Sequence, residues 1–577
     1  MKKKMTALCG LLLFVSGITK AQQSTTCTSP NAYTTIHGNN IRAGILNAGD
    51  LFWDLNDPQF IPNPTPNGPN PSTIFAAGLW LGGVDPAGNL KLATSTYRDA
   101  SADITDYWAG PLDDQGIIDA FVCPDWDKLF KVKGADIKAF LDDLPTLVNN
   151  PALALAAYKS IMGWPGKGNP YFLGAWGFDL PVTLAPLAPF FDTDQDGIYN
   201  PLAGDYPVVQ LRNKAPFVPA EIVWCVFNDE GGGAEHSASF GATIHAEVQL
   251  TVWAFKCPNE SVLNNAVFTS HKIINRAAER IDSFFVGLWV DFDLGCRTDD
   301  YMGCAPDLDA FFAYNQDAID GTNGILCDQG VPTFADTSPV QSVTFLSRPM
   351  DKFVYYNDLS VGNWPAGTTD PDLPSEYYNY LTGRWKDGSP LTYGGDGYQE
   401  SVNTDFAFPD DPVSPNGWSM CSANLAFADR RVLASSKIGT LVPGAIEELV
   451  AAWTVHPKPN LPCGVGTTYA DIAFLRSEFE NNFPNACSGL ISAAQEPRGM
   501  PVGIFPNPAA ETVTLQYGDL PVREIRLFAA DGRLVHSLQN IHSEQTVLDV
   551  ASLKNGVYAV QLLTERGSVV RKISVLK

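Results

Sequence analysis

Short runs of aromatic and β-branched residues, separated by glycine, proline and asparagine, fill most of this 577-residue chain. Residues of the first kind fit the pleated surface of a sheet, whereas glycine and proline supply turns and interrupt helices. The 49 Gly and 43 Pro argue against long helices, and 32 Phe, 19 Tyr and 13 Trp argue against disorder. The sequence therefore predicts an all-β fold, built mainly of antiparallel β-sandwich modules.

The stretch from Ile244 to Trp253 shows the strand pattern most clearly, because every second residue is apolar. Its other face carries His245, Glu247 and Gln249, which we expect to face solvent. A further strand is expected over 447–455. Helical periodicity appears mainly in a small insert around residues 135–162 and again over 468–480.

The N-terminus has the pattern of a secretory signal peptide. Lys2, Lys3 and Lys4 precede an apolar run of about a dozen residues, and a small-residue site ends at Ala21. That run is short for a bilayer, which needs roughly twenty residues. We therefore expect residues 1–21 to be removed and the mature chain, starting at Gln22, to contain no transmembrane segment.

Charge and cysteine content limit the partners and the cellular compartment that we expect. The net charge is −25, and loss of the four lysines in residues 1–21 makes it −29. Such a chain repels phosphate backbones, which excludes nucleic acid as an expected partner. The ten cysteines after residue 21 favour disulfides in an exported protein. Their pairing stays open, although Cys296 and Cys304 could close a short loop.

From Ile504 onward, alternating strands with marked turns predict a small Ig-like sandwich. Several of its motifs resemble the C-terminal sorting domain of the type IX secretion system. They lie at Phe505-Pro506-Asn507-Pro508, Asp531-Gly532-Arg533, Asn555-Gly556-Val557-Tyr558, and Lys572 to Lys577.

This resemblance implies export through the periplasm and across the outer membrane to the cell surface or medium. The implied partners are the type IX secretion machinery and a surface peptidase that cleaves off the tail. We expect a linker at 488–503, the sorting domain at 504–577, and a β-rich body of one or two subdomains at 22–487. The body resembles uncharacterised extracellular regions that precede such tails, and that resemblance implies no activity.

A calcium-type loop is predicted at residues 192–205. Carboxylates at loop positions 1, 3 and 5, followed by Gly197, can converge on one hard cation. The candidate ligands are Asp192, Asp194, Asp196, the carbonyl of Ile198, Asn200 and Asp205. Position 12 is Ala203 instead of the glutamate of an EF-hand, and the loop is more similar to those of thrombospondin type 3 repeats. We expect calcium here, in a structural role.

A second acidic group contains Asp291, Asp293, Asp299 and Asp300. Asp291 and Asp293 share one face if the strand continues, so their charges repel unless a cation or proton intervenes. The group could bind another metal ion, act as the paired carboxylates of a glycosidase, or belong to a solvated loop.

The sequence favours a calcium-stabilised binding or structural body, with glycans or other surface polymers as possible ligands. Trp364 and Trp385 lie in polar contexts and are the candidates for surface aromatics, since most other tryptophans lie within apolar strand patterns. The alternative is a secreted hydrolase of polysaccharide or peptide that uses Asp291 and Asp293. No zincin or serine-hydrolase sequence motif is present.

Overall fold

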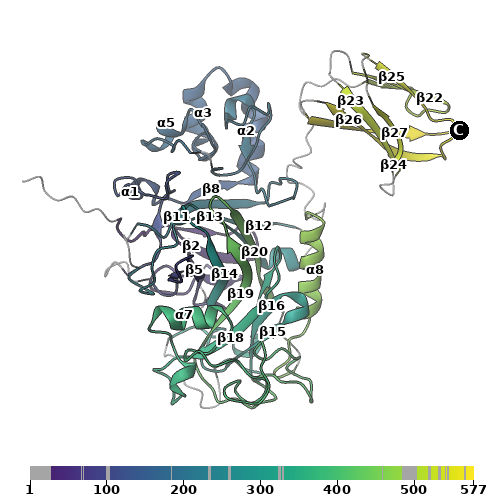
Figure 1. Cartoon of the computed structure of the whole chain (residues 1–577). Helices are drawn as coiled ribbons and strands as arrows, with labels where there is room; N and C mark the ends of the chain where they lie inside the picture. The colour runs from purple at the N-terminus through teal and green to yellow at the C-terminus, as the bar shows by residue number, and fades with distance from the viewer. Residues whose placement is uncertain are drawn as a thin grey trace, which may run out of the picture.

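The computed structural model describes most of the chain beyond the predicted signal peptide. The described residues are 27–66, 68, 70–98, 104–183, 185–231, 236–257, 261–321, 327, 330–457, 459, 461–483, 503–517, 522–529, 534–539, 541, 543, 545–564 and 567–577. Within them, the body forms two nine-stranded antiparallel sheets that pack face to face, and a smaller two-sheet domain follows (Figure 1). The mainly β fold predicted from the sequence is confirmed.

The first sheet runs in the order β1-β2-β3-β5-β14-β19-β18, with β4 beside β2 and β6 beside β5. Its strands are β1 (Tyr33–Ile36), β2 (Ile41–Leu46), β3 (Asp50–Leu51), β4 (Phe60–Pro62), β5 (Ala76–Val84), β6 (Leu90–Thr94), β14 (Ile281–Asp291), β18 (Lys352–Asn357) and β19 (Arg430–Leu441).

The second sheet runs in the order β15-β16-β17-β20-β13-β12-β11-β7, with β8 beside β11. Its strands are β7 (Trp108–Ala109), β8 (Phe130–Lys133), β11 (Glu221–Asn228), β12 (Ala246–Ala254), β13 (Ala266–Asn275), β15 (Asp300–Ala305), β16 (Ala310–Asn315), β17 (Val340–Phe345) and β20 (Ile446–His456). A separate pair is formed by β9 (Phe190–Phe191) and β10 (Tyr206–Pro207).

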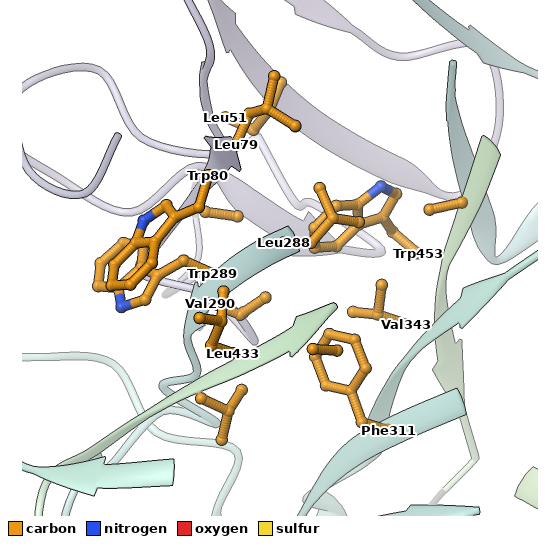
Figure 2. Packing of buried hydrophobic residues seen from close by; sticks show 14 of the residues in the cluster. Leu51, Leu79, Trp80, Leu288, Trp289, Val290, Phe311, Val343, Leu433 and Trp453 are labelled. Atoms are coloured by element: carbon orange, nitrogen blue, oxygen red, sulfur yellow. The ribbon is translucent and has the colours of Figure 1, made fainter. Parts of the chain in front are cut away.

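The main core fills the space between the two sheets. Figure 2 shows Leu288 of the first sheet near Trp453 and Val343 of the second. Trp453 is fully buried, and its ring centroid lies 4.8 Å from that of Phe52 in an edge-to-face contact. Rings in this geometry add to the stability that burial of their apolar surface supplies.

A second core lies on the other face of the second sheet, where the helical insert packs. The predicted alternation of β12 is confirmed, since Ala246, Val248 and Leu250 lie in the main core. Its opposite face does not reach solvent as expected, because Glu247 and Gln249 are also buried. There Gln249 Nε2 donates to the carbonyl of Pro186 at 2.6 Å, so the segment that precedes β9 covers this face.

The predicted helices are present in the insert and over residues 468–480. Asn150 caps one of them by accepting from the Leu153 amide at 3.2 Å. The helices are α1 (Cys123–Trp126), α2 (Gly134–Leu147), α3 (Pro151–Ala157), α4 (Lys159–Met162), α5 (Phe172–Trp176), α6 (Ser261–Asn264), α7 (Pro374–Leu381) and α8 (Thr468–Glu480), with the 3-10 turns η1 (Pro201–Ala203), η2 (Pro306–Leu308), η3 (Ala335–Thr337) and η4 (Ala366–Thr368). No helix among the described residues has the length and apolar character needed to cross a membrane.

Disulfides join Cys27 to Cys123, Cys296 to Cys327, and Cys421 to Cys463. The disulfide considered between Cys296 and Cys304 is therefore not formed, and that prediction is wrong. Cys304 is a buried thiol on β15, and that strand points it into the main core while Cys296 stays in the preceding loop.

The C-terminal domain has two sheets and a core of its own, which includes Val513, Ile525, Leu562 and Ile573. One sheet contains β21 (Gly503–Phe505), β22 (Thr512–Gln516) and β25 (Gln545–Asp549), and the other contains β23 (Val522–Ala529), β24 (Leu534–Gln539), β26 (Gly556–Thr564) and β27 (Gly567–Val575). The predicted linker 488–503 lies outside the described residues, except for Gly503 at the start of β21.

Candidate ligand pocket and acidic loops

A cavity of about 410 Å³ lies at one end of the first sheet. Strand β14 ends there at Asp291, and β19 begins there at Arg430, so the antiparallel register places Asp291 directly opposite Arg431. The loop after β14 brings Asp293 and Arg297 to the same cavity, and the residue before β19 adds Asp429. The sheet thus gathers residues that are about 140 positions apart in the sequence.

Three carboxyl groups form the centre of the pocket. Oxygens of Asp291, Asp293 and Asp429 lie within 4.8 Å of one another. Arg431 lies beside them, with Nε 3.5 Å from Asp291 Oδ1 and Nη1 3.3 Å from Asp429 Oδ1. The same guanidinium also pairs with Asp358 at 3.0 Å, and Arg297 Nη1 lies 3.1 Å from Asp429 Oδ2. Two guanidinium groups therefore partly neutralise four carboxylates.

An aromatic wall borders this charged centre. The Tyr97 hydroxyl donates to Asp291 Oδ2 and accepts from Arg431 Nε at 2.9 Å. The Tyr97 ring packs edge to face against Phe75 and Trp289, with centroid distances of 5.9 and 5.0 Å. Because Tyr97 is 37% exposed, a ligand in the pocket can contact this wall.

The pocket holds carboxyl groups in both protonation states near neutral pH. Burial, together with the nearby charge of Asp291, raises the pKa of Asp429 to about 7. The same causes hold the pKa of Asp293 well above its usual value. Burial also raises the pKa of Asp291, against the opposing effect of Arg431. Such a set offers both donors and acceptors of hydrogen bonds.

The other two members of the second acidic group, Asp299 and Asp300, do not line this pocket. They lie at the start of β15, where an Asp299 oxygen comes within 4.8 Å of Asp320. The sequence group is thus divided between two sites, one at the end of each sheet.

The predicted calcium loop brings Asp192, Asp194 and Asp205 together, with oxygens within 4.8 Å of one another. Asp205 is fully buried, and its oxygens accept from the Thr193 and Asn200 amides, both at 2.8 Å. Burial raises the pKa of Asp205 to about 6. Asp205 therefore stands close to the place that position 12 would occupy in an EF-hand.

The other predicted ligands of this loop are arranged differently. Asp196 is outside the close group, and its Oδ1 accepts from the Ile198 amide at 2.7 Å. The Asn200 side chain caps η1 by accepting from the Leu202 amide at 3.2 Å. Gly197 has a φ of 78°, which supports the sharp turn expected there.

Ser342, His456 and Asp471 form a Ser–His–Asp arrangement. The sequence did not predict it, because its members share no local motif. His456 Nε2 lies 2.7 Å from Ser342 Oγ, and Nδ1 lies 2.9 Å from Asp471 Oδ2. These are the atom pairs that activate a serine nucleophile in hydrolases. Ser342 is completely buried, however, and the neighbouring cavity of about 420 Å³ is lined by His456 but not by Ser342. The three side chains tie α8 to β17 and β20.

The tryptophans considered for surface binding do not form an exposed patch. Trp385 is 1% exposed and packs in the main core, which contradicts the expectation from its polar sequence context. Its indole N–H donates to the Gly397 carbonyl at 2.8 Å, so the polar neighbours serve to satisfy it. Trp364 is half-buried beside the Arg430 guanidinium.

In the tail, residues of the predicted motifs hold the last strand in place. Asn507 donates to the Lys572 carbonyl at 3.0 Å and accepts from the Ser574 amide at 2.8 Å. Asn555 accepts from the Lys577 amide at 2.9 Å. The remaining predicted motif residues with a described position are Pro506, Pro508, Gly556 and Tyr558, while Asp531 and Gly532 lie outside the described residues.

Residues 503–576 match the family described as the secretion system C-terminal sorting domain. This match confirms the predicted type IX sorting tail. The chain is thus exported to the cell surface or extracellular space, and the secretion machinery is its partner.

No curated protein matches the chain. Among solved structures, a polysaccharide lyase is similar at 8% identity, over 57% of this chain and 34% of the lyase, with a TM-score of 0.16. The aligned part therefore spans about a third of the lyase. A likeness at this level assigns neither fold nor activity to the body.

Proposed function

We propose that the body is a calcium-stabilised binding module that holds a neutral glycan in the pocket at the end of the first sheet. The observation that carries this proposal is the meeting of an aromatic wall with a cluster of carboxyl and guanidinium groups in one cavity. Its volume of about 410 Å³ falls in the range of small-molecule sites.

The aromatic wall and the charged centre of the pocket match the apolar and polar surfaces of a sugar ring. The Tyr97 and Phe75 rings offer apolar faces for the C–H side of the ring. Asp293 and Arg297 offer acceptors and donors for its hydroxyl groups. Even with Asp429 partly protonated, these residues carry no excess positive charge, so an anionic sugar gains no attraction over a neutral one.

A glycan array with the chain from Gln22 to Lys577 tests this function. The wild type is expected to bind neutral oligosaccharides. Phe75→Leu keeps apolar volume but removes the ring face, and it should weaken binding about tenfold, since 1.4 kcal/mol is one decade in Kd. Tyr393→Ala, which removes an exposed aromatic outside the pocket, is the matched control. Preference for anionic glycans, or equal binding by Phe75→Leu, would contradict the proposal.

A paired-carboxylate hydrolase is the second candidate for the same pocket. It is favoured by the close approach of Asp291, Asp293 and Asp429 and by the titration of Asp429 near neutral pH. Release of reducing ends from a glycan that binds, and its loss in Asp293→Asn with binding retained, would favour this candidate over pure binding.

We also propose that the 192–205 loop binds calcium in a structural role, through Asp192, Asp194 and Asp205. Because an ion that binds only the folded state stabilises it, calcium should raise the melting temperature relative to chelator. Asp194→Ala should remove the share of this rise that comes from the loop. Asp113→Ala, in an exposed turn, should retain the full rise. An identical rise in Asp194→Ala and wild type would exclude the loop as a calcium site.

The surface peptidase that acts on such tails is proposed to cleave within residues 488–503. This segment joins the last helix of the body to the sorting domain. Cleavage there would leave both cores intact, since the core of the tail contains residues from 509 onward. Release into the medium and attachment to the surface are both compatible with this cut.

A further inference from the structure

Two aspartates at the start of β15 and one from the loop after β16 are buried without a balancing positive charge in the described part of the chain. Asp299 and Asp300 are 0% exposed, and Asp320 is 1% exposed. Oxygens of Asp299 and Asp320 lie within 4.8 Å of each other, and Asp300, which follows Asp299 directly in the chain, lies outside this closest group but is buried beside it. Carboxylates in such a place are costly unless they are paired or coordinate a metal ion.

Among the described residues, the hydrogen-bond donors to these carboxylates are backbone amides. Asp300 Oδ2 accepts from the Leu294 amide at 2.8 Å, and Asp299 Oδ2 accepts from the Gly321 amide at 3.0 Å. The second oxygen of each, Asp299 Oδ1 and Asp300 Oδ1, is buried and has no hydrogen-bond partner. None of the three aspartates forms an ion pair with a lysine or arginine in the described part of the chain.

Protonation does not account well for this arrangement. Burial raises the pKa of Asp299 to about 6 and that of Asp320 to about 7, and it holds the pKa of Asp300 well above its usual range. Both Asp320 oxygens, however, accept amide hydrogens, from Cys296 at 2.9 Å and from Phe334. Two acceptor oxygens are the pattern of an ionised carboxylate. A cation is therefore the partner that the geometry lacks.

A neutral oxygen ligand is available beside the carboxylates. Asn315 is directly opposite Asp300 in the β15–β16 register, so their side chains lie on the same face of the sheet. Asn315 is 6% exposed, and its Nδ2 donates to the carbonyl and the carboxylate of Asp317, both at 3.3 Å, which leaves its own Oδ1 for another partner. That buried Oδ1 has no hydrogen-bond partner.

We infer that Asp299, Asp300 and Asp320, with Asn315 Oδ1, bind a calcium ion at this end of the second sheet. The nearby Cys296 sulfur is in a disulfide with Cys327, so it cannot serve as a thiolate ligand. An oxygen-only set favours hard cations, and calcium accepts the largest number of protein oxygens among these.

The ion would fix the loop that carries part of the pocket. Residues 292–299 connect β14 to β15 and include Asp293, Gly295 and Arg297 of the pocket lining. Gly295 has a φ of 79°, and a Cβ placed there would lie 2.2 Å from Asp320 Oδ2. The pocket loop therefore rests directly on an ion ligand. The ion site itself does not depend on what the pocket binds.

Counting bound ions in the chain from Gln22 to Lys577 tests the inference. After removal of metal with chelator, calorimetric titration with calcium should show two ions in the wild type, one in the 192–205 loop and one here. Asp300→Asn should lose one ion, and Asp194→Ala should lose the other. Asp307→Asn removes an exposed carboxylate of η2 that is not a proposed ligand, and it should keep both.

A second measurement first leaves the buried site unchanged and then alters it. In Asp194→Ala the buried site alone remains, so calcium should still raise the melting temperature relative to chelator. Adding Asp300→Asn to that chain should abolish the rise. If Asp194→Ala binds no calcium and shows no rise, the inference is overturned. If the wild type binds one ion that survives in Asp194→Ala, the loop proposal fails and this one stands.

Discussion

Deletion of residues 503–577 is expected to stop the protein from reaching the cell surface or medium in a bacterium with type IX secretion. The deleted segment is the part that matches the secretion system C-terminal sorting domain. Its core is built from its own residues, and its sheets pair only with each other among the described strands. The body should therefore still fold and accumulate in the periplasm. Immunoblots of surface, medium and periplasmic fractions measure the outcome.

Two control experiments test whether the tail itself directs export. Asp194→Ala in the full chain changes the body but leaves the tail intact, so it should be exported like the wild type. Residues 503–577 fused to a periplasmic reporter should direct that reporter outward, since the domain carries its own core. Surface appearance of the truncated chain would mean that another segment directs export.

Two motifs of the tail meet at its last strand. Asn507 bridges the Lys572 carbonyl and the Ser574 amide, and Asn555 holds the Lys577 amide. These contacts explain why motifs near both ends of the domain belong together: the first motif positions the final strand. The sequence predicts the motifs, but only the fold shows that they meet.

Local patterns in the sequence predict the elements well. The alternation of β12 and the helical period of α8 are both visible in short windows, because each depends on which side chains face a core. What local patterns cannot show is whether the second face of a strand is covered. Glu247 and Gln249 look solvent-facing in sequence, yet they are buried, where Arg276 pairs with Glu247 and the Pro186 carbonyl accepts from Gln249.

Only some of the pocket residues could be predicted from the sequence. Asp291 and Asp293 stand out as a pair, whereas Asp429 and Arg431 lie in an unremarkable stretch far along the chain. Their role depends on the β14–β19 register, which places Arg431 opposite Asp291. Likewise, the partner of Asp299 is Asp320, from the loop after β16. Long-range strand pairing carries no local sequence signal, so such contacts require the fold.

Arg431→Met is expected to destabilise the body strongly. The guanidinium lies near Asp291, Asp358 and Asp429, and it is almost completely buried. Its removal leaves these carboxylates with Arg297 as their remaining partner in the pocket. Breaking a buried ion pair by removing one member typically costs about 3–5 kcal/mol of unfolding free energy. Urea unfolding at about pH 8, with calcium present, measures the loss.

The pH dependence identifies the cause of that loss. A carboxyl whose folded-state pKa is raised binds more protons in the folded than in the unfolded state, so stability falls as pH rises. The pKa of Asp429 is already about 7 with Arg431 in place, and it should rise further without it. The defect of Arg431→Met should therefore shrink between about pH 8 and pH 5.

Two further variants separate charge from packing in this result. Asp429→Asn added to Arg431→Met removes one uncompensated charge and should restore part of the stability at high pH. Arg280→Met breaks a surface pair with Asp282, where the arginine side chain is 56% exposed, and should cost no more than about 1 kcal/mol. A loss in Arg431→Met that does not change with pH would point to lost packing. The acidic pocket would then need a source of charge balance other than Arg431, and a bound cation would become the better explanation.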